Sequence, residues 1–199
     1  MQEAAANTFR VVCLGGSAGA FSAYSEILRN LPANTGMAFV VVAHRALKQK
    51  EKRLLSQALS FVTSMPVVEV EHGMQLEPDR VFVMPPGVDM TISHNHLHLK
   101  PGSKPHGWPI ALSVFLQSLA DSVGPRAVAI ILSGLDHDGS VAMGSIKAGG
   151  GITFAQSNPA HSDMPRHAIE TGYVDFVMHP AEIAKTLLAL AQNDLNRPT

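Results

Sequence analysis

Short apolar runs rich in β-branched residues alternate along the chain with segments of helical periodicity, and this alternation limits the possible folds most. Amphipathic spacing occupies residues 20–31, 54–62, 114–123 and 183–190. Strands that alternate with helices predict βαβ units. Because several runs are apolar at nearly every position, we expect helices on both faces of a mostly parallel sheet. The sequence therefore predicts an α/β fold, a three-layer α/β/α sandwich, with strands at residues 9–14, 38–43, 66–70, 80–84, 127–132, 152–155 and 174–177.

Residues 91–99 follow another pattern, alternating around Asn95, which predicts an antiparallel hairpin appended to the main sheet. His94, His96 and His98 stand at every second position and could share one face of a strand, as metal ligands do. A turn centred on Asn95 would separate them, and no cysteine or carboxylate stands nearby. We therefore expect no metal site and no cofactor.

The length of 199 residues predicts one domain, which we place at residues 9–193 between short tails at 1–8 and 194–199. A net charge of −1 offers no field for a phosphate backbone, which argues against nucleic acid as a partner. The single cysteine, Cys13, cannot form an internal disulfide and is expected in the core. The N-terminus lacks signal-peptide features and the apolar runs are short, so we expect a cytoplasmic protein without membrane insertion.

The first predicted strand leads directly into Gly15-Gly16-Ser17-Ala18-Gly19, which fits the G-x-S-x-G pattern of a nucleophile turn. At the junction of a buried strand and a helix, such a turn projects the serine hydroxyl at the carboxyl end of the sheet. A serine that only caps the helix remains the alternative. A dinucleotide site is disfavoured, because G-x-G-x-x-G spacing is absent and the second strand ends at His44 rather than at an acidic residue.

Two other strand ends carry groups that could serve this serine. His44 follows the second strand, and imidazole is the base that a serine needs near neutral pH, although a lone histidine there is more often structural. Asp136 and Asp138 follow the strand at 127–132, where a carboxylate could orient the imidazole. An Asp-Gly pair is also common in turns and helix caps. Because the carboxyl ends of parallel strands gather at one edge, we expect the three elements to converge.

These segments resemble the catalytic domain of the CheB-type chemotaxis protein-glutamate methylesterases over nearly the whole chain. The Ser17 turn looks like the family's G-A-S-T-G-G, His44 matches its strand-end histidine, and residues 134–139 look like its G-M-G-x-D-G loop. Further matches lie at residues 81–87, 155–156 and 164–169. The resemblance implies a serine hydrolase that removes methyl groups from glutamyl esters on receptor helices and deamidates certain glutamines.

By position, the resemblance gives roles to single residues. It implies Ser17 as nucleophile, His44 as general base and then acid, and Asp138 as the orienting carboxylate. It also implies an oxyanion hole formed by the backbone N–H groups of Ala18 and Leu135. The partner it implies is a methylated receptor or another helical signalling protein.

The sequence also departs from the family pattern. Family members of full length carry an N-terminal receiver domain, whereas the first predicted strand here starts at residue 9, so we expect a regulator that acts in trans. Arg45 stands where a Met-Pro pair is common, Asp136 replaces a glycine, and residues 108–112 replace Arg-Pro-Ser-Val-Asp by Trp-Pro-Ile-Ala-Leu. We expect this last change to make the cleft more apolar, unless those side chains pack inward. The residues expected at the substrate cleft are Arg45, Trp108, Asp136, Met164 and Arg166.

Two other functions remain open on sequence grounds. The departures at Arg45, Asp136 and Trp108 would suit a catalytically weak or inactive module that keeps the fold and docks a signalling partner. The apolar segment at 108–112 would suit a small-molecule esterase. Labelling of an activated serine separates the first of these from an enzyme.

Overall fold

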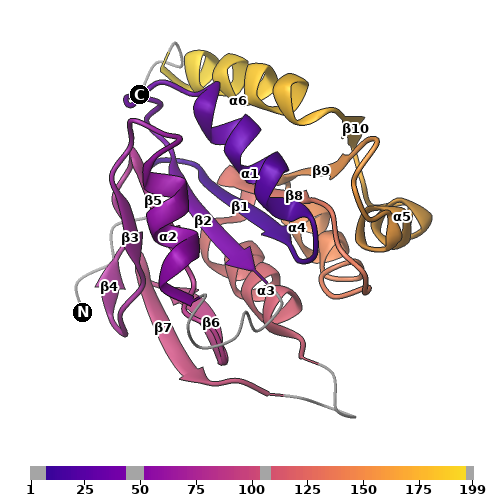
Figure 1. Cartoon of the computed structure of the whole chain (residues 1–199), viewed down its shortest axis with the longest axis horizontal. Coiled ribbons are helices and arrows are strands. Elements are labelled where there is room, and N and C mark those ends of the chain that lie inside the picture. Colours follow the sequence, from indigo (N-terminus) through magenta and orange to yellow (C-terminus); the bar gives the residue numbers. More distant parts are fainter. Residues whose placement is uncertain (1–7, 44–51, 104–108, 196–199) are drawn as a thin grey trace.

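The computed structural model describes residues 8–43, 52–103 and 109–195 of the chain, and the statements below concern these residues (Figure 1). Its centre is a seven-stranded sheet in which every neighbouring pair is parallel. The sheet order is β10 (Phe176–Met178), β9 (Ile152–Gln156), β8 (Ala127–Ile131), β1 (Val11–Gly16), β2 (Ala38–Ala43), β5 (Arg80–Val83) and β3 (Val67–Glu69). β1 therefore lies in the middle, with β8 on one side and β2 on the other.

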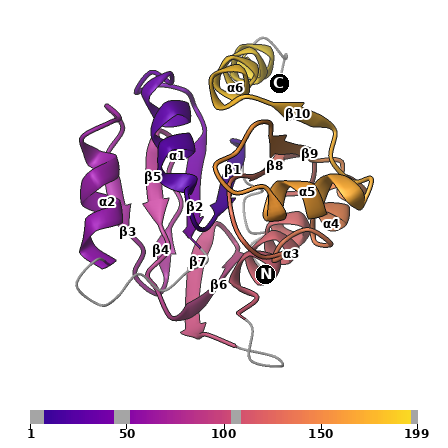
Figure 2. The same cartoon turned by 45° about the vertical axis from the view of Figure 1, so that its right-hand side comes forward.

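Helices cover both faces of this sheet, which confirms the three-layer α/β/α prediction (Figures 1 and 2). Side chains of α1 (Ala20–Arg29), α2 (Lys52–Ser60) and α6 (Pro180–Leu195) pack with Val12 and Leu14 of β1. Side chains of α3 (Ala111–Val123), α4 (Met143–Ala148) and α5 (Asp163–Glu170) pack with Val11 and Cys13. β1 is apolar at successive positions because each of its faces meets a layer of helices.

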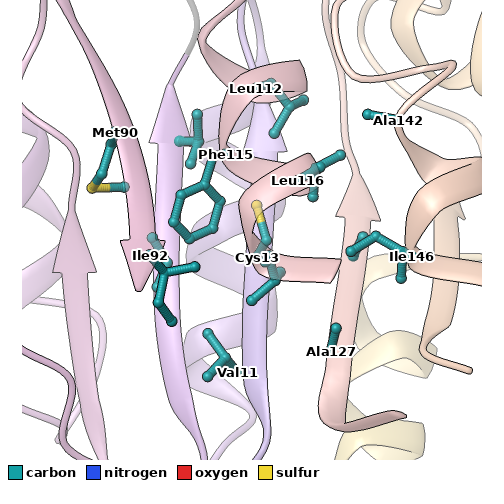
Figure 3. Packing of buried hydrophobic residues seen from close by; sticks show 14 of the residues in the cluster. Val11, Cys13, Met90, Ile92, Leu112, Phe115, Leu116, Ala127, Ala142 and Ile146 are labelled. Atoms are coloured by element: carbon teal, nitrogen blue, oxygen red, sulfur yellow. The ribbon is translucent and has the colours of Figure 1, made fainter. Parts of the chain in front are cut away.

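The layer beneath α3 is closely packed. Leu112, Phe115 and Leu116 of α3 lie over Val11 and Cys13 of β1, and all five are buried (Figure 3). Cys13 is thus a core residue, as expected. A short 3-10 turn, Gly124–Arg126, connects α3 to β8.

A second, antiparallel sheet contains β4 (Met74–Gln75), β7 (His96–Pro101) and β6 (Val88–Ser93) and packs against α3. β6 and β7 form the expected hairpin. His94 and Asn95 form its turn with φ angles of 49° and 64°, which a two-residue type I′ turn requires. Thr91 pairs with His98, and His96 hydrogen-bonds the carbonyl of His94.

The ends of several elements differ from the sequence-based boundaries by a few residues. The first strand begins at Val11 and continues through Gly16, and β4 was not predicted, because a two-residue strand carries no periodicity. Asp194 belongs to α6, where its carboxylate binds the buried Arg10 guanidinium through two hydrogen bonds. Within the described ranges, no helix combines the length and apolarity needed to span a bilayer.

Candidate functional site

Ser17 lies on a tight turn between β1 and α1, at the carboxyl edge of the central sheet. Its N–H donates to the carbonyl of Ser133 at 2.9 Å, and its own carbonyl accepts the N–H of Ala20 at 3.2 Å. Gly19 has a φ of 75°, a left-handed conformation that costs glycine little and brings the chain into the helix. Ser17 remains partly exposed, so its hydroxyl is accessible to a substrate.

The turn is crowded where its glycines lie. A Cβ atom on Gly16 would lie 2.7 Å from Ala20 Cβ and 2.8 Å from the hydroxyl oxygen of Tyr24. A Cβ on Gly134 would lie 2.8 Å from Ser17 Oγ and 2.0 Å from Met164 Sδ. Close approach of the two loops around Ser17 therefore requires glycine at both positions.

The backbone of Leu135 contacts the Ser17 hydroxyl. Its N–H donates to Ser17 Oγ at 3.4 Å. Ala18, the other residue for which a backbone role was expected, follows Ser17 directly and is partly exposed. Backbone N–H groups beside a serine hydroxyl are suited to hold the negative oxygen of a tetrahedral intermediate.

Asp138 is 6% exposed and lies against the N-terminus of α3. Its Oδ2 accepts the N–H of Leu112 at 2.8 Å, and its Oδ1 accepts the N–H of Ser113 at 3.0 Å together with the Ser113 hydroxyl. Ile110, at the start of the helix, has no side chain that can cap it. Asp138 thus caps α3 from 26 residues away in the sequence.

The Asp138 carboxylate also affects the pKa of a buried group, the Cys13 thiol. Burial, together with this nearby negative charge, raises the pKa of the Cys13 thiol far above its usual value. Cys13 is on β1, three residues before the serine turn begins at Gly16. The carboxylate thus lies close to the strand that carries Ser17.

Three residues expected at the site, His44, Arg45 and Trp108, lie outside the described residues. The strand that precedes His44 is described. β2 ends at Ala43, whose register partner on β1 is Gly16, the residue before Ser17. The neighbouring strands β1 and β2 therefore end side by side, which is the arrangement that the sequence predicted for this edge of the sheet.

Asp136 and Asp138 have different roles in the structure. The Asp138 N–H donates to Asp136 Oδ1 at 2.9 Å, so the side chain of Asp136 holds the backbone of the loop. Both aspartates line a pocket of about 240 Å³ beside α3. The other residues of this pocket are Pro109, Ile110, Ser113, His137 and Val141.

Met164 and Arg166 are both residues expected at the substrate cleft, and Arg166 lines a pocket of about 340 Å³ together with Gln156 and Ser162. Met164 is wholly buried, since its thioether packs under Gly134, and it supports the loop without offering surface to a substrate. Arg166 lies on the exposed side of α5 and forms ion pairs with Glu170 at 2.9 Å and with Asp163 at 3.5 Å.

The residues of the apolar segment at 108–112 that the structure describes do not all face the same way. Leu112 is fully buried, and it is the side chain that a Cβ on Gly15 or on Gly139 would strike, at 2.5 and 2.6 Å. The expectation that it adds apolar surface to the cleft is wrong, because its side chain fills the core between these two glycines (Figure 3). Ile110 is half-buried and does line the pocket beside Asp138.

Sequence reasoning missed three polar residues at this edge. Ser113 holds Asp138, while Ser133 and Gln156 contact the serine turn and its neighbouring loop. Gln156 ends β9 and Ser133 follows β8 by two residues, and this position near a strand end was a usable signal for both. In the part of the chain that the structure describes, no three His, Cys, Asp or Glu side chains are grouped so that they could hold a metal ion.

Comparison with known proteins gives a consistent result. The family model described as "CheB methylesterase" matches residues 12–187. A "Protein-glutamate methylesterase/protein-glutamine glutaminase 1" of Syntrophus aciditrophicus is 29% identical over 186 residues, covering 92% of this chain. The crystal structure of the Thermotoga maritima CheB methylesterase catalytic domain superposes with a TM-score of 0.83 at 25% identity, covering 92% of this chain and 98% of that domain.

A further relative has a different length. An uncharacterized 104.1 kDa protein of Rhodobacter capsulatus is 39% identical over 123 residues, or 61% of this chain. The chain spans 13% of the Rhodobacter protein and 53% of the Syntrophus protein.

Proposed function

The chain belongs to the CheB methylesterase family, and on that basis we propose that it is a protein-glutamate methylesterase that uses Ser17 as its nucleophile. One observation carries the proposal: the Ser17 hydroxyl lies partly exposed on a strand-end turn and accepts the backbone N–H of Leu135. A serine that only capped α1 would direct its oxygen at the helix N–H groups. No capping hydrogen bond from a side chain is found at this helix start.

The proposed reaction begins when Ser17 Oγ attacks the carbonyl carbon of a glutamyl methyl ester. His44 takes the hydroxyl proton as the new C–O bond forms, and the carbonyl oxygen becomes an oxyanion. The N–H groups of Ala18 and Leu135 stabilise this oxyanion. Loss of one such donor typically costs about 2.7–4 kcal/mol of transition-state stabilisation.

The intermediate collapses by breaking the bond to the methoxy group, which leaves as methanol with the proton from His44. Water then attacks the acyl-enzyme and gives one proton to His44, which passes it to Ser17 Oγ as the acyl C–O bond breaks. The glutamic acid formed loses its own proton to solvent as a carboxylate. Asp138 holds the imidazole in the productive tautomer. Deamidation of a glutamine follows the same steps, with ammonia as the leaving group.

We place the enzyme in the cytoplasm, as is normal for this family, acting on methylated receptor helices. The pocket beside Asp138 supports a substrate that presents an apolar side chain next to its ester. Ile110 and Val141 line this pocket, and Val141 is 78% exposed. Binding there would remove their apolar surface from water.

A fluorophosphonate probe tests the proposal, because only an activated serine reacts with it rapidly. We expect one adduct, on Ser17, which Ser17→Ala abolishes. Ser22→Ala is the matched control, because this exposed serine lies in the first turn of α1 and its hydroxyl only donates to the Gly19 carbonyl. Methanol release from methylated receptor peptides is then measured for both variants.

The outcomes separate the candidate functions. Folded protein that is not labelled would indicate a binding module without activity. Labelling at Ser17 with turnover of small esters, but no methanol from receptor peptides, would indicate a small-molecule esterase. Labelling together with methanol release supports the methylesterase.

A further inference from the structure

Every polar atom of Ser133 is used at the junction of three loops at the carboxyl edge of the sheet. Its carbonyl accepts the Ser17 N–H at 2.9 Å, and its hydroxyl donates to the Ala18 carbonyl at 2.7 Å. The same hydroxyl accepts the His161 N–H at 3.0 Å, and the Ser133 N–H donates to Gln156 Oε1 at 2.9 Å. Ser133 itself is fully buried.

From these contacts we infer that Ser133 is a positioning residue for catalysis, one that sets the direction of the Ala18 N–H in the oxyanion hole. The inference rests on the proposed function of Ser17. It does not give Ser133 any contact with the substrate.

The argument follows from the peptide planes of the turn. The Ser17 N–H belongs to the peptide before Ser17, and the Ala18 carbonyl belongs to the peptide after Ala18. Ser133 holds both of these planes through its carbonyl and its hydroxyl. The peptide between them carries the Ala18 N–H, and with both neighbours fixed and each peptide planar, its rotation is restricted.

A hydroxyl is the group suited to this position, since it can donate to a carbonyl and accept an N–H at the same time. Alanine would leave the Ala18 carbonyl and the His161 N–H without this partner. Space around the hydroxyl is tight, because a Cβ on Gly19 would lie 2.9 Å from Ser133 Oγ. The turn therefore packs directly onto the group that holds it.

Ser140 offers a matched control on the same loop. It is also buried, at 4% exposed, but its hydroxyl has no hydrogen-bond partner among the described residues. Replacing either serine by alanine removes one buried hydroxyl. Only the Ser133 variant removes a hydrogen bond to the serine turn, the one accepted by the Ala18 carbonyl.

The test compares the wild type, Ser133→Ala, Ser133→Cys and Ser140→Ala as full chains. For each protein, kcat and KM are measured for a methyl ester substrate. The dissociation constant of phenylboronic acid is measured as well, because this compound forms a tetrahedral adduct with an active serine. The third measurement is the final fraction of chains labelled by a fluorophosphonate. Ser133→Cys keeps a side-chain group that can donate and accept, although its sulfur is larger than oxygen and forms weaker hydrogen bonds, so it tests the same contact where the alanine variant folds poorly.

For Ser133→Ala we expect kcat to fall about 10–100-fold, the range that a small misplacement of catalytic groups produces. The affinity for phenylboronic acid should fall in parallel, while KM and the final labelled fraction stay near the wild-type values. Ser140→Ala should match the wild type, and Ser133→Cys should lie between. A role in folding alone would lower the labelled fraction and leave the kcat per labelled chain unchanged.

Two results would overturn the inference: a kcat for Ser133→Ala within about twofold of the wild type, or a loss that matches the loss of labelled chains. Both leave the function of Ser17 intact. Absence of labelling in the wild-type protein would instead refute the proposed function itself.

Discussion

Asp138→Asn should damage the protein in two separable ways, because the carboxylate has two tasks. In the proposed reaction it orients His44, and in the structure it caps α3. Asparagine is normally as good a helix cap as aspartate, since a cap needs one oxygen. Here the two oxygens serve different donors, with Oδ2 bound to Leu112 N–H and Oδ1 to the N–H and hydroxyl of Ser113.

The cost in stability follows from this geometry. An amide has one oxygen, so an NH₂ group must face one of the donors. If the amide oxygen keeps Ser113, the buried Leu112 N–H loses its acceptor, which costs about 1–3 kcal/mol. Loss of the negative charge at the helix N-terminus adds about 0.3–1 kcal/mol. We expect the free energy of unfolding to fall by about 1–4 kcal/mol in total.

The cost in activity is larger. The corresponding substitution in the worked serine-protease case lowers kcat by about 10⁴. A domain of ordinary stability, about 5–15 kcal/mol, that loses 4 kcal/mol at most remains more than about 80% folded. Unfolding therefore cannot explain a loss of activity greater than a few-fold. Any larger loss comes from the chemistry.

The assay combines guanidinium chloride denaturation with the rate of fluorophosphonate labelling at Ser17. Ser113→Ala is the comparison variant: it removes the hydroxyl that donates to Asp138 and accepts the Gly139 N–H but keeps the carboxylate, so it should lower stability and lose far less rate than Asp138→Asn. Asp136→Asn keeps the oxygen that accepts the Asp138 N–H and should also retain most of the rate. If Asp138→Asn were destabilised but labelled at the wild-type rate, Asp138 would be a helix cap only, and its place in the triad would be refuted.

Three further predictions concern other parts of the structure. Gly134→Ala should abolish turnover, measured as methanol release, because its Cβ would lie 2.0 Å from the Met164 sulfur and displace the loop that carries the oxyanion donor. Cys13 should react with iodoacetamide only when the protein unfolds, because burial and a nearby carboxylate raise the pKa of its thiol; fast alkylation of folded protein would contradict this. The pKa of Asp175 is lowered, since hydrogen bonds led by that of Lys147 outweigh the effect of partial burial. Its contribution to stability should therefore be complete above the pKa of the unfolded chain and lost as the pH falls through the lower folded pKa, so Asp175→Asn should flatten the acid side of a thermal-denaturation profile.

The fold was largely predictable because its strongest sequence signal has a simple physical cause. β1, β2 and β8 are buried on both faces, so nearly every position is apolar and the runs stand out. The hairpin was predictable from the alternation around Asn95. β4 was not, because its pairing with β7 depends on tertiary contact rather than on a pattern within Met74–Gln75.

The site was predictable at the level of strand ends. Ser17 and Asp138 stand out as candidates in the sequence because they follow buried strands, which meet at one edge of a parallel sheet. The hydrogen bonds around them were not predictable. Asp138 caps α3, whose first turn lies 26 residues earlier in the sequence, and Leu112 in that turn packs inward. Both contacts depend on where α3 begins relative to the Asp138 loop, which no local pattern reveals.

The inward packing of Leu112 shows how this site depends on α3. Its side chain fills the space beside Gly15 on the serine strand and beside Gly139 on the loop that carries Asp138, while its N–H is bound by Asp138 itself. Since one residue contacts both the serine strand and the loop of Asp138, their spacing is linked to the position of the helix. An aspartate at position 112 would bury a second carboxylate next to the first, where like charges repel strongly. The leucine and the capping role of Asp138 are thus mutually consistent, and a change in substrate preference is better sought at Ile110, which is half-buried and lines the pocket.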